Sequence, residues 1–397
     1  MHLLHILPRL PAPPNDGGAV YVYNMLRELR SLGHRLTIVS LISNKHDQNS
    51  EQTAELGELF AEEGNFKPYS LYSVIKSTLT RQPITIQHRM KTDIVGRLLS
   101  KVSDKPDVIL LEGLHTAAFL DLARKRFPEV PIVLRQVNVE YLLLKRNGSL
   151  SKNLFKKWFY FDQAILMKRF ELQKMRDADY VTSISENDIR KYRKDLPDVE
   201  YFLNTAGAYV KEDPESGRDP SIILAVSNWR WQPNLDGLDW FLNEIWPAIH
   251  NQHPKMHFHI AGEGLSESFK NRYVNNNIHF LGFVDDIDSL RNKASIFVAP
   301  LLSGSGMKLK VIEALAAGMP TVTTSFGAEG IEIEDKIHYL HADEAKQFEH
   351  AVISLIQSRN LRIKLSSAGK EQIKLKYTWK QKAQDLSSFL EKIKKIK

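Results

Sequence analysis

A glycine-rich loop followed by two lysines, in the second half of this 397-residue chain, has the residue types of a phosphate site. Residues 303–306 read Ser-Gly-Ser-Gly, Lys308 and Lys310 follow, and Glu313 lies in the next turns of a helical pattern. Glycines allow the backbone to approach an anion, and the start of the next helix offers unpaired N–H groups. Glu313 is a suitable acceptor for vicinal ribose hydroxyls. The spacing indicates a nucleoside diphosphate cradle; the alternative is a glycine-rich turn before an exposed basic helix face.

Three further loops at the ends of predicted strands have residues suited to binding. Gly17 and Gly18 stand between the first strand and the first helix, where paired glycines let an anion approach. Arg230 stands between two tryptophans, an arrangement that suits phosphate or base recognition. Residues 325–330 again contain two glycines. A structural alternative remains for each loop: a tight turn at the glycines, and surface packing of the tryptophans against Arg230.

The composition excludes several classes of site. The sequence has no cysteine, so disulfides, thiolate catalysis and sulfur-based zinc sites are excluded. The 14 histidines show no metal-binding helical spacing, and we interpret His257 and His259 as a solvated or packed pair, so no metal site is predicted. A net charge of +7 favours anionic partners. No nucleic-acid-binding signature is present, and nucleic acid is not a predicted partner.

No apolar run approaches the roughly 18 residues that a membrane-spanning helix needs. The first residues lack the basic start and long apolar stretch of a signal peptide, so we expect a cytoplasmic protein. Residues 145–161 combine five Lys or Arg residues with the aromatic run 158–161. Two interpretations of this stretch remain: peripheral contact with the inner face of an anionic membrane, or aromatics packed inside with solvated lysines.

Short apolar or β-branched runs alternate with longer helical patterns, which is typical of a parallel α/β architecture. In the first half the predicted strands are residues 3–7, 36–41, 108–111, 132–134 and 180–184. In the second half they are residues 222–226, 256–260, 278–281, 296–299 and 321–324. Helical spacing and stop signals predict helices at residues 22–29, 155–176, 309–317 and 379–397. The two sets of strands, separated by a polar linker at residues 211–220, indicate two doubly wound domains.

Several motifs, taken in their order along the chain, resemble the family-4 glycosyltransferases of the GT-B fold. The second half carries the specific matches, at residues 260–264, 279–286, 294–300 and 313–322. The first half is similar at Gly17 and Gly18, and at residues 32–37 and 178–186. The resemblance covers essentially the whole chain.

The resemblance implies an α/β protein of two Rossmann-like domains that face each other across a cleft. Residues 1–205 would bind most of the acceptor, with the helix 379–397 packing back on them, and residues 206–378 would bind the nucleotide-sugar. The implied reaction is sugar transfer with retention of configuration, from a UDP- or GDP-sugar donor, without a bound metal or a tightly bound cofactor. The implied acceptor is a glycan or lipid-linked molecule, in the synthesis of a cell-surface polysaccharide or glycoconjugate.

The resemblance and the local chemistry together assign roles to individual positions. Arg230, Lys308 and Lys310 are assigned to the leaving diphosphate. His115 is assigned to the acceptor side, where Glu112 and Glu140 are further candidates. The residues implied in donor binding stand in predicted loops or in the first turns of predicted helices. They are Gly17, Gly18, Asn228, Gly262, Val284, Gly304, Ser305, Gly306 and Glu313.

Three positions depart from the family pattern. Ser305 stands where the first glutamate of a paired-glutamate motif is usual, a residue that usually lies by the donor sugar. Asn228 and Pro233 stand where many members have arginine and lysine. Two other functions therefore remain open: a sugar-nucleotide epimerase of the same fold, and a non-catalytic partner subunit that binds the nucleotide-sugar.

Overall fold

The computed structural model describes residues 1–43, 48–66, 70–151, 153–212, 217–273, 277–304 and 306–396. Contacts divide the chain into two compact units, Met1–Thr205 together with Lys380–Lys397, and Ala206–Trp379. They are called the N-terminal and C-terminal units. None of the helices in the described part of the chain is long and apolar enough to cross a membrane.

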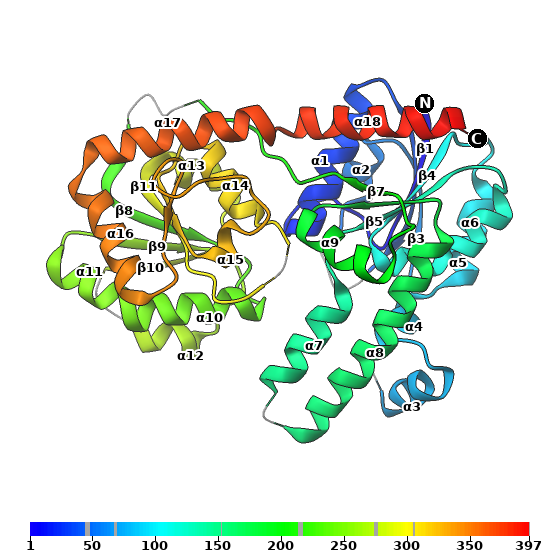
Figure 1. Ribbon diagram of the computed structural model, residues 1–397, viewed down its shortest axis with the longest axis horizontal. Helices are drawn as coiled ribbons and strands as arrows, with labels where there is room; N and C mark the ends of the chain where they lie inside the picture. Colours follow the sequence, from blue (N-terminus) through cyan, green and yellow to red (C-terminus); the bar gives the residue numbers. More distant parts are fainter. Residues whose placement is uncertain are drawn as a thin grey trace. The chain divides into compact units, whose positions relative to one another are not determined.

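The N-terminal unit is built on a parallel sheet in the order β3-β2-β1-β4-β5-β6-β7 (Figure 1). Its strands are β1 His2–Leu7, β2 Arg35–Ile42, β3 Glu58–Glu63, β4 Val108–Glu112, β5 Ile132–Gln136, β6 Tyr180–Ser183 and β7 Tyr201–Leu203. The order reverses between β1 and β4, as in a doubly wound sheet. The central strands β1, β4 and β5 are buried almost throughout, which explains why their sequences are mostly apolar apart from the members of a buried charged network.

Helices connect these strands. They are α1 Gly17–Ser31, α2 Ser50–Ala54, α3 Leu71–Thr80, α4 Ile84–Arg89, α5 Thr92–Lys101, the 3₁₀ helix η1 Leu114–Phe119, α6 Leu120–Arg126, α7 Glu140–Leu150, α8 Leu154–Asp177 and α9 Glu186–Asp195. Figure 1 shows α7 and α8 extending away from the sheet of this unit as a helical hairpin.

The last helix, α18 Trp379–Ile396, packs on the N-terminal unit. The ring of Phe389 stacks on Phe202, with 4.4 Å between centroids, and meets the edge of Tyr180 at 5.7 Å. Ser387 Oγ lies 2.8 Å from His34 Nε2. The apolar face of this helix is therefore covered by β6, β7 and the segment after α1.

The C-terminal unit has a second parallel sheet, in the order β10-β9-β8-β11-β12-β13. Its strands are β8 Asp219–Val226, β9 His257–Ala261, β10 Ile278–Gly282, β11 Ala294–Ala299, β12 Thr321–Thr323 and β13 Leu340–His341. Its helices are α10 Gln232–Trp240, the π-helical turn η2 Phe241–Ile245, α11 Trp246–Gln252, α12 Glu267–Lys270, the 3₁₀ turn η3 Asn271–Tyr273, α13 Ile287–Lys293, α14 Leu309–Ala316, α15 Ser325–Ala328, α16 Ala345–Gln357 and α17 Arg359–Lys376.

The predicted α/β class is confirmed, and each strand and helix predicted from the sequence is present. Their ends agree within one or two residues, except that β8 begins three residues and α1 five residues before the predicted start. The sequence missed β3, β7 and β13, which lie at edges of their sheets. Edge strands bury less apolar surface, and β3 reads Glu-Leu-Phe-Ala-Glu-Glu, so none of these segments shows a buried-strand pattern. The strand predicted over 321–324 ends one residue earlier, because the Thr324 hydroxyl caps α15.

A charged network is buried in the N-terminal unit at the level of β1, β4 and β5. Glu112 Oε1 lies 3.0 Å from His5 Nδ1, and Glu112 Oε2 accepts from Arg135 Nε. The Arg135 guanidinium lies 3.8 Å from the centroid of the Tyr21 ring on α1. All four side chains are almost completely buried. Burial alone would raise the pKa of Glu112, but Arg135 and His5 overcome it and lower that pKa to about 2.

This network predicts a large loss of stability when one partner is removed. Arg135→Met leaves the Glu112 carboxylate buried without its main counter-charge, and we expect a loss of about 3–5 kcal/mol in the free energy of unfolding, measured in urea at pH 7. The matched control is Lys105→Met, which breaks the exposed Lys105–Glu129 pair and should change stability by less than about 1 kcal/mol.

The pH dependence of unfolding gives a second measurement on the same residue. The pKa of Glu112 is lowered from its ordinary value of 4.5, so its stabilising contribution is present above pH 4.5 and is lost as the pH falls toward 2. Equal stability of Arg135→Met and the wild-type protein between pH 7 and pH 4.5 would contradict this description of the network.

Candidate functional site

Most predicted binding residues lie in the loops after β8, β9, β10 and β11 of the C-terminal unit. These strands are parallel neighbours, so their carboxyl ends meet at one edge of the sheet. In doubly wound sheets, ligands bind at this edge. The loops are residues 227–231, 262–266, 283–286 and 300–308.

Two glycines after β9 allow its loop to touch the loop after β8. Gly262 has φ +117°, and a Cβ there would lie 1.8 Å from the Ser227 carbonyl oxygen. Gly264 has φ +103°, and a Cβ there would lie 2.4 Å from Arg230 Cγ. Any larger residue would force the loops apart, so the predicted donor residue Gly262 is required for the close approach of the two loops.

The two tryptophans beside Arg230 have different environments. Trp229 is buried, and its indole N–H donates to the Ala261 carbonyl at 3.0 Å. Trp231 is exposed. Asn228 accepts from the backbone N–H of Arg230 through its side-chain oxygen at 3.0 Å, so this predicted donor residue shapes the loop. The prediction that both indoles flank Arg230 in recognition is therefore wrong for Trp229, which secures the loop from inside.

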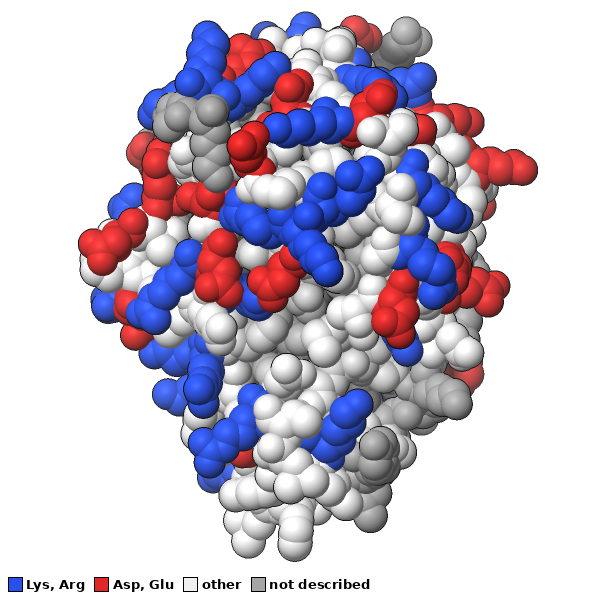
Figure 2. All heavy atoms as spheres, turned by 90° about the vertical axis from the view of Figure 1, so that its right-hand side faces the viewer, with Lys and Arg blue, Asp and Glu red and all other residues white. Residues whose placement is uncertain are grey.

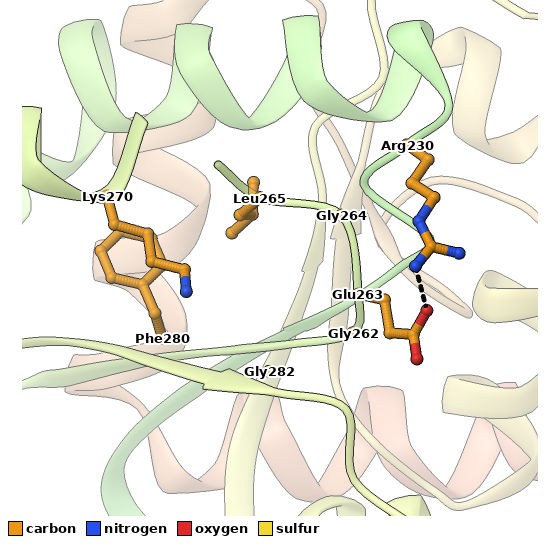
Figure 3. A pocket seen from close by; sticks show the side chains of 8 residues that line it. All are labelled: Arg230, Gly262, Glu263, Gly264, Leu265, Lys270, Phe280 and Gly282. Atoms are coloured by element: carbon orange, nitrogen blue, oxygen red, sulfur yellow. Dashed lines mark ion pairs between the residues drawn. The ribbon is translucent and has the colours of Figure 1, made fainter. Parts of the chain in front are cut away.

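A pocket of about 230 Å³ opens between the loops after β8, β9 and β10 (Figure 3). Arg230 and Glu263 lie on one side of it, where their side chains form an ion pair at 2.8 Å. Lys270 and the ring of Phe280 lie on the other side. The remaining lining residues are Gly262, Gly264, Leu265 and Gly282. The pocket offers cations, a carboxylate and an aromatic face within the C-terminal unit.

Lys310, on the first turn of α14, reaches back to the segment that follows β8. Its ammonium donates to Ser227 Oγ and to Asn234 Oδ1, both at 2.7 Å. Burial disfavours the ammonium form, and the charge of Lys308 adds repulsion, which together lower the pKa of Lys310 to about 7. The two oxygen partners are neutral. A partly buried cation held in this way is suited to a ligand that brings negative charge.

Lys308 precedes α14 and lies over the glycine loop. Its ammonium donates to the Gly306 carbonyl and lies 3.9 Å from a carboxylate oxygen of Glu329. Gly304 and Gly306 both have positive φ, at +135° and +72°. No side chain of the described residues caps the N-terminus of α14. The first amides of α14 and two lysines thus lie together, as the sequence indicated. The predicted donor residue Ser305 lies outside the described residues.

Glu313, one turn further along α14, already has a cationic partner. Its Oε2 accepts from Arg291 Nη2 at 2.5 Å, and Arg291 Nη1 also donates to Asp288 at 3.0 Å. The carboxylate is half-buried and held in one orientation. A ribose hydroxyl could therefore donate to this carboxylate only while Arg291 also donates to it. Sequence reasoning missed Arg291 as a partner of Glu313.

Two further predicted binding segments of this unit, at Val284 and at residues 325–330, have different structures. Val284 is half-buried in the loop after β10. Residues 325–328 form the short helix α15, which corrects the interpretation of this segment as an open glycine loop. A Cβ at Gly327 would lie 1.8 Å from Thr323 Oγ1, so this glycine is needed for packing against β12.

The first amides of α1 are occupied from within the protein. Asp16 caps the helix, and its Oδ1 accepts from the N–H groups of Gly18 and Ala19 at 3.0 and 3.1 Å. Asp16 also pairs with Arg9. Gly17 and Gly18 therefore begin a capped helix in which Asp16 binds the Gly18 amide, and the role of this loop in donor binding stays a prediction.

His115 lies in η1, directly after β4, in the N-terminal unit. Burial, and then the charge of Arg89, lower the pKa of His115 to about 3, so its ring is neutral at physiological pH. Burial raises the pKa of Glu140, an effect that Asn138 and Arg89 reduce. The charge of Arg89 thus lowers the pKa of both His115 and Glu140. Glu112, the third candidate, is a member of the buried charged network and faces no open surface.

The structure brings Lys308, Lys310, Gly262 and Asn228 to one edge of the C-terminal sheet. Sequence reasoning missed Ser227 and Asn234 as the partners of Lys310, and Glu263 as the partner of Arg230. Within the described ranges, no group of three or more His, Asp or Glu side chains is arranged to hold a metal ion.

Comparison with known proteins identifies a family domain in the C-terminal unit. Residues 220–358 match the family Glycosyl transferases group 1. A Klebsiella pneumoniae protein described as an uncharacterized 44.6 kDa protein in cps region is 26% identical over 337 residues, which cover 81% of this chain and 82% of that protein.

Solved structures of the same fold superpose over almost the whole chain. Sucrose-phosphate synthase from Thermosynechococcus elongatus does so with a TM-score of 0.74 at 14% identity, covering 100% of both chains. A TarM variant from S. aureus, solved with fondaparinux, alpha-GlcNAc-glycerol and UDP, gives a TM-score of 0.71 at 10% identity, covering 98% of this chain and 99% of that one.

At these identities the solved structures show the fold alone, while the sequence match shows the family of the C-terminal unit. The resemblance predicted from the sequence is therefore confirmed at two levels: residues 220–358 match the family Glycosyl transferases group 1, and the chain has the GT-B fold of the solved structures.

Proposed function

We propose that the C-terminal unit binds the diphosphate of a UDP- or GDP-sugar through Lys310, and that the protein transfers the sugar to a glycan or lipid-linked acceptor. The observation that carries the proposal is the Lys310 ammonium, held at 2.7 Å by Ser227 and Asn234 beside the glycine-lined pocket. Gly262 lies against both the pocket and the Ser227 carbonyl, so the pocket and the cation adjoin. A nucleoside diphosphate fits a site with these two parts.

The chemistry requires positive charge where the leaving diphosphate gains negative charge. When the bond between the anomeric carbon and the phosphate oxygen breaks, the sugar becomes oxocarbenium-like and the diphosphate takes the electron pair. Lys308, the ammonium form of Lys310 and the first N–H groups of α14, which no described side chain caps, supply positive charge for this step. These groups support a reaction that proceeds without a bound metal.

Arg230 is proposed as a further phosphate partner. Its ion pair with Glu263 is largely exposed, and such surface pairs contribute only about 0–1 kcal/mol. A diphosphate can therefore take the guanidinium from Glu263 at little cost and form stronger charge-assisted hydrogen bonds with it.

On the acceptor side, a neutral His115 can exchange hydrogen bonds with a hydroxyl but does not carry a positive charge at neutral pH. We propose that the N-terminal unit binds the acceptor and that the sugar is transferred with retention of configuration. The UDP bound in the TarM variant supports a UDP-sugar donor, and the relative in the cps region supports a place in polysaccharide synthesis.

A donor panel tests the proposed function. Purified protein is mixed with UDP-, GDP-, ADP- and dTDP-sugars, and thermal shift and product formation are followed. A donor at a hundred times its Kd should stabilise the protein by about 2.7 kcal/mol. Conversion of the donor to an isomeric nucleotide-sugar without acceptor would indicate an epimerase. Absence of binding to any nucleotide-sugar would contradict the proposal, and binding without turnover would indicate a partner subunit.

Lys310→Ala should lower kcat by about a hundredfold, because one charge-assisted partner of the leaving group contributes about 2–4 kcal/mol to the transition state. The measurement is the release of nucleoside diphosphate under saturating donor. The control is Lys364→Ala, an exposed lysine on α17 of the same unit, which should leave kcat unchanged. Equal turnover in the two variants removes Lys310 from the site.

The pKa of Lys310 predicts the pH dependence of nucleotide binding. The pKa is lowered from 10.5 to about 7, so the free protein loses this cation as the pH rises above 7. Between pH 7 and pH 9, where the phosphates remain ionised, the Kd for UDP or GDP should rise by up to about tenfold per pH unit. Arginine stays charged, so Lys310→Arg should flatten the curve. A flat wild-type titration by calorimetry contradicts the assignment.

Glu313→Gln tests the ribose role. Replacing a charged acceptor by a neutral one should weaken UDP or GDP binding by about tenfold. The same variant should bind the 2′,3′-dideoxy nucleotide as the wild-type protein does, because that ligand lacks the hydroxyls. Glu371→Gln on α17 serves as the control. An equal loss for both ligands would mean that Glu313 acts only through its pair with Arg291.

A further inference from the structure

The tip of the α7–α8 hairpin exposes large apolar side chains to solvent. Leu154 and Phe155, in the first turn of α8, are 80% and 85% exposed, and Trp158 is 61% exposed. Ile165, two turns further along α8, is 72% exposed. Soluble proteins rarely leave several such side chains uncovered on one short segment, and an uncovered group marks an interaction surface.

The packing of the hairpin explains which aromatics are exposed. A Cβ at Gly148 of α7 would lie 3.2 Å from Tyr160 Cβ and 3.3 Å from the Phe161 ring, so Tyr160 and Phe161 face α7. Leu154 and Trp158 precede Phe161 by seven and three residues and share its side of α8, yet they are 80% and 61% exposed. The interpretation that the aromatic run packs inside is therefore correct in part for residues 159–161 and wrong for Trp158.

Hydrogen bonds join the two helices at the base of the hairpin, whereas large apolar side chains at its tip are exposed. The buried Glu171 of α8 accepts from the first amides of α7, Glu140 N and Tyr141 N, at 3.3 and 3.4 Å. Its carboxylate also accepts from the Tyr192 hydroxyl. The apolar tip is thus held on a built support and is not a frayed end.

A second helix adds exposed apolar residues at the same end of the unit. Figure 1 shows α3 beside α8, and Gln163 Nε2 of α8 donates to Ser77 Oγ of α3 at 3.1 Å. On α3, Ile75 is 50% exposed and Leu79 is 79% exposed. Exposed apolar side chains therefore occur on both helices at this end of the unit.

The charge around the tip has one sign. Residues 143–161 contain five Lys or Arg residues and no Asp or Glu. Figure 2 shows white and blue spheres at the lower end of this face, whereas red spheres gather above it. The exposed residues at the tip are called the hairpin-tip patch: Leu154, Phe155, Trp158, Lys145, Lys156 and Lys157.

We propose that the hairpin-tip patch docks the protein on an anionic lipid bilayer. The apolar side chains enter the boundary between headgroups and acyl chains, and the lysines lie against lipid phosphates. Charge complementarity selects this occupant, since a second copy of the chain would bring the same positive charges against the first. The proposal rests on this surface alone and stands or fails separately from the donor site.

Co-flotation with vesicles tests the docking. The wild-type protein should float with vesicles of 30% phosphatidylserine in phosphatidylcholine, and much less with phosphatidylcholine alone or in 0.5 M salt. Lys156→Ala with Lys157→Ala should weaken binding about 25-fold, about fivefold per lysine. Phe155→Ser with Trp158→Ser should weaken it by tenfold or more. The blue shift of tryptophan fluorescence on vesicle binding should be lost in Trp158→Phe.

The matched control is Ile363→Ser with Leu375→Ser on α17, where the two side chains are 54% and 60% exposed and lysines are also close in sequence. This variant should bind vesicles as the wild-type protein does. All variants change exposed residues, and their circular dichroism and unfolding temperature should match the wild-type protein. Equal binding of both double serine variants overturns the proposal, as does sedimentation of the wild-type protein as a dimer that Phe155→Ser with Trp158→Ser dissociates.

Discussion

The candidate site depends on one cation held between two loops by neutral oxygens. Lys310 extends from α14 to Ser227 and Asn234 and so ties the segment after β11 to the segment after β8. Gly262 lets the loop after β9 approach the same Ser227. Burial disfavours the charged form of this ammonium, and in the proposed complex a diphosphate would favour that form again. The same residue therefore serves as a structural link in the free protein and as a charge partner in the proposed complex.

The two units differ in how their charged side chains and the starts of their helices are paired. In the N-terminal unit, Asp16 closes the start of α1, and Arg135 is neutralised by Glu112 beneath it. In the C-terminal unit, α14 begins without a side-chain cap among the described residues, and two lysines follow the glycine loop. The start of a helix that no described side chain caps, with two lysines beside it, is suited to an anion. This difference supports the proposal that an anion binds in the C-terminal unit.

The features predicted correctly from the sequence are those that residue type and hydrophobic period determine locally. Buried central strands are mostly apolar, and the glycines and lysines at the start of α14 are a local pattern. The edge strands β3, β7 and β13 were missed because half-exposed segments carry mixed residues. The pairing of Arg291 with Glu313, and of Lys310 with Ser227, joins residues far apart in the chain and becomes visible only in the fold. The cap at Asp16 is different, since an aspartate directly before a helix is a known signal that could have excluded Gly17 and Gly18.

The most direct measurement is a crystal structure of the protein with UDP or GDP bound. If the nucleotide occupies the edge formed by the loops after β8, β9 and β11, the Lys310 ammonium should leave Ser227 or Asn234 and lie about 3 Å from a phosphate oxygen. A nucleotide bound elsewhere, or one bound while Lys310 keeps both of its present partners, would contradict the account.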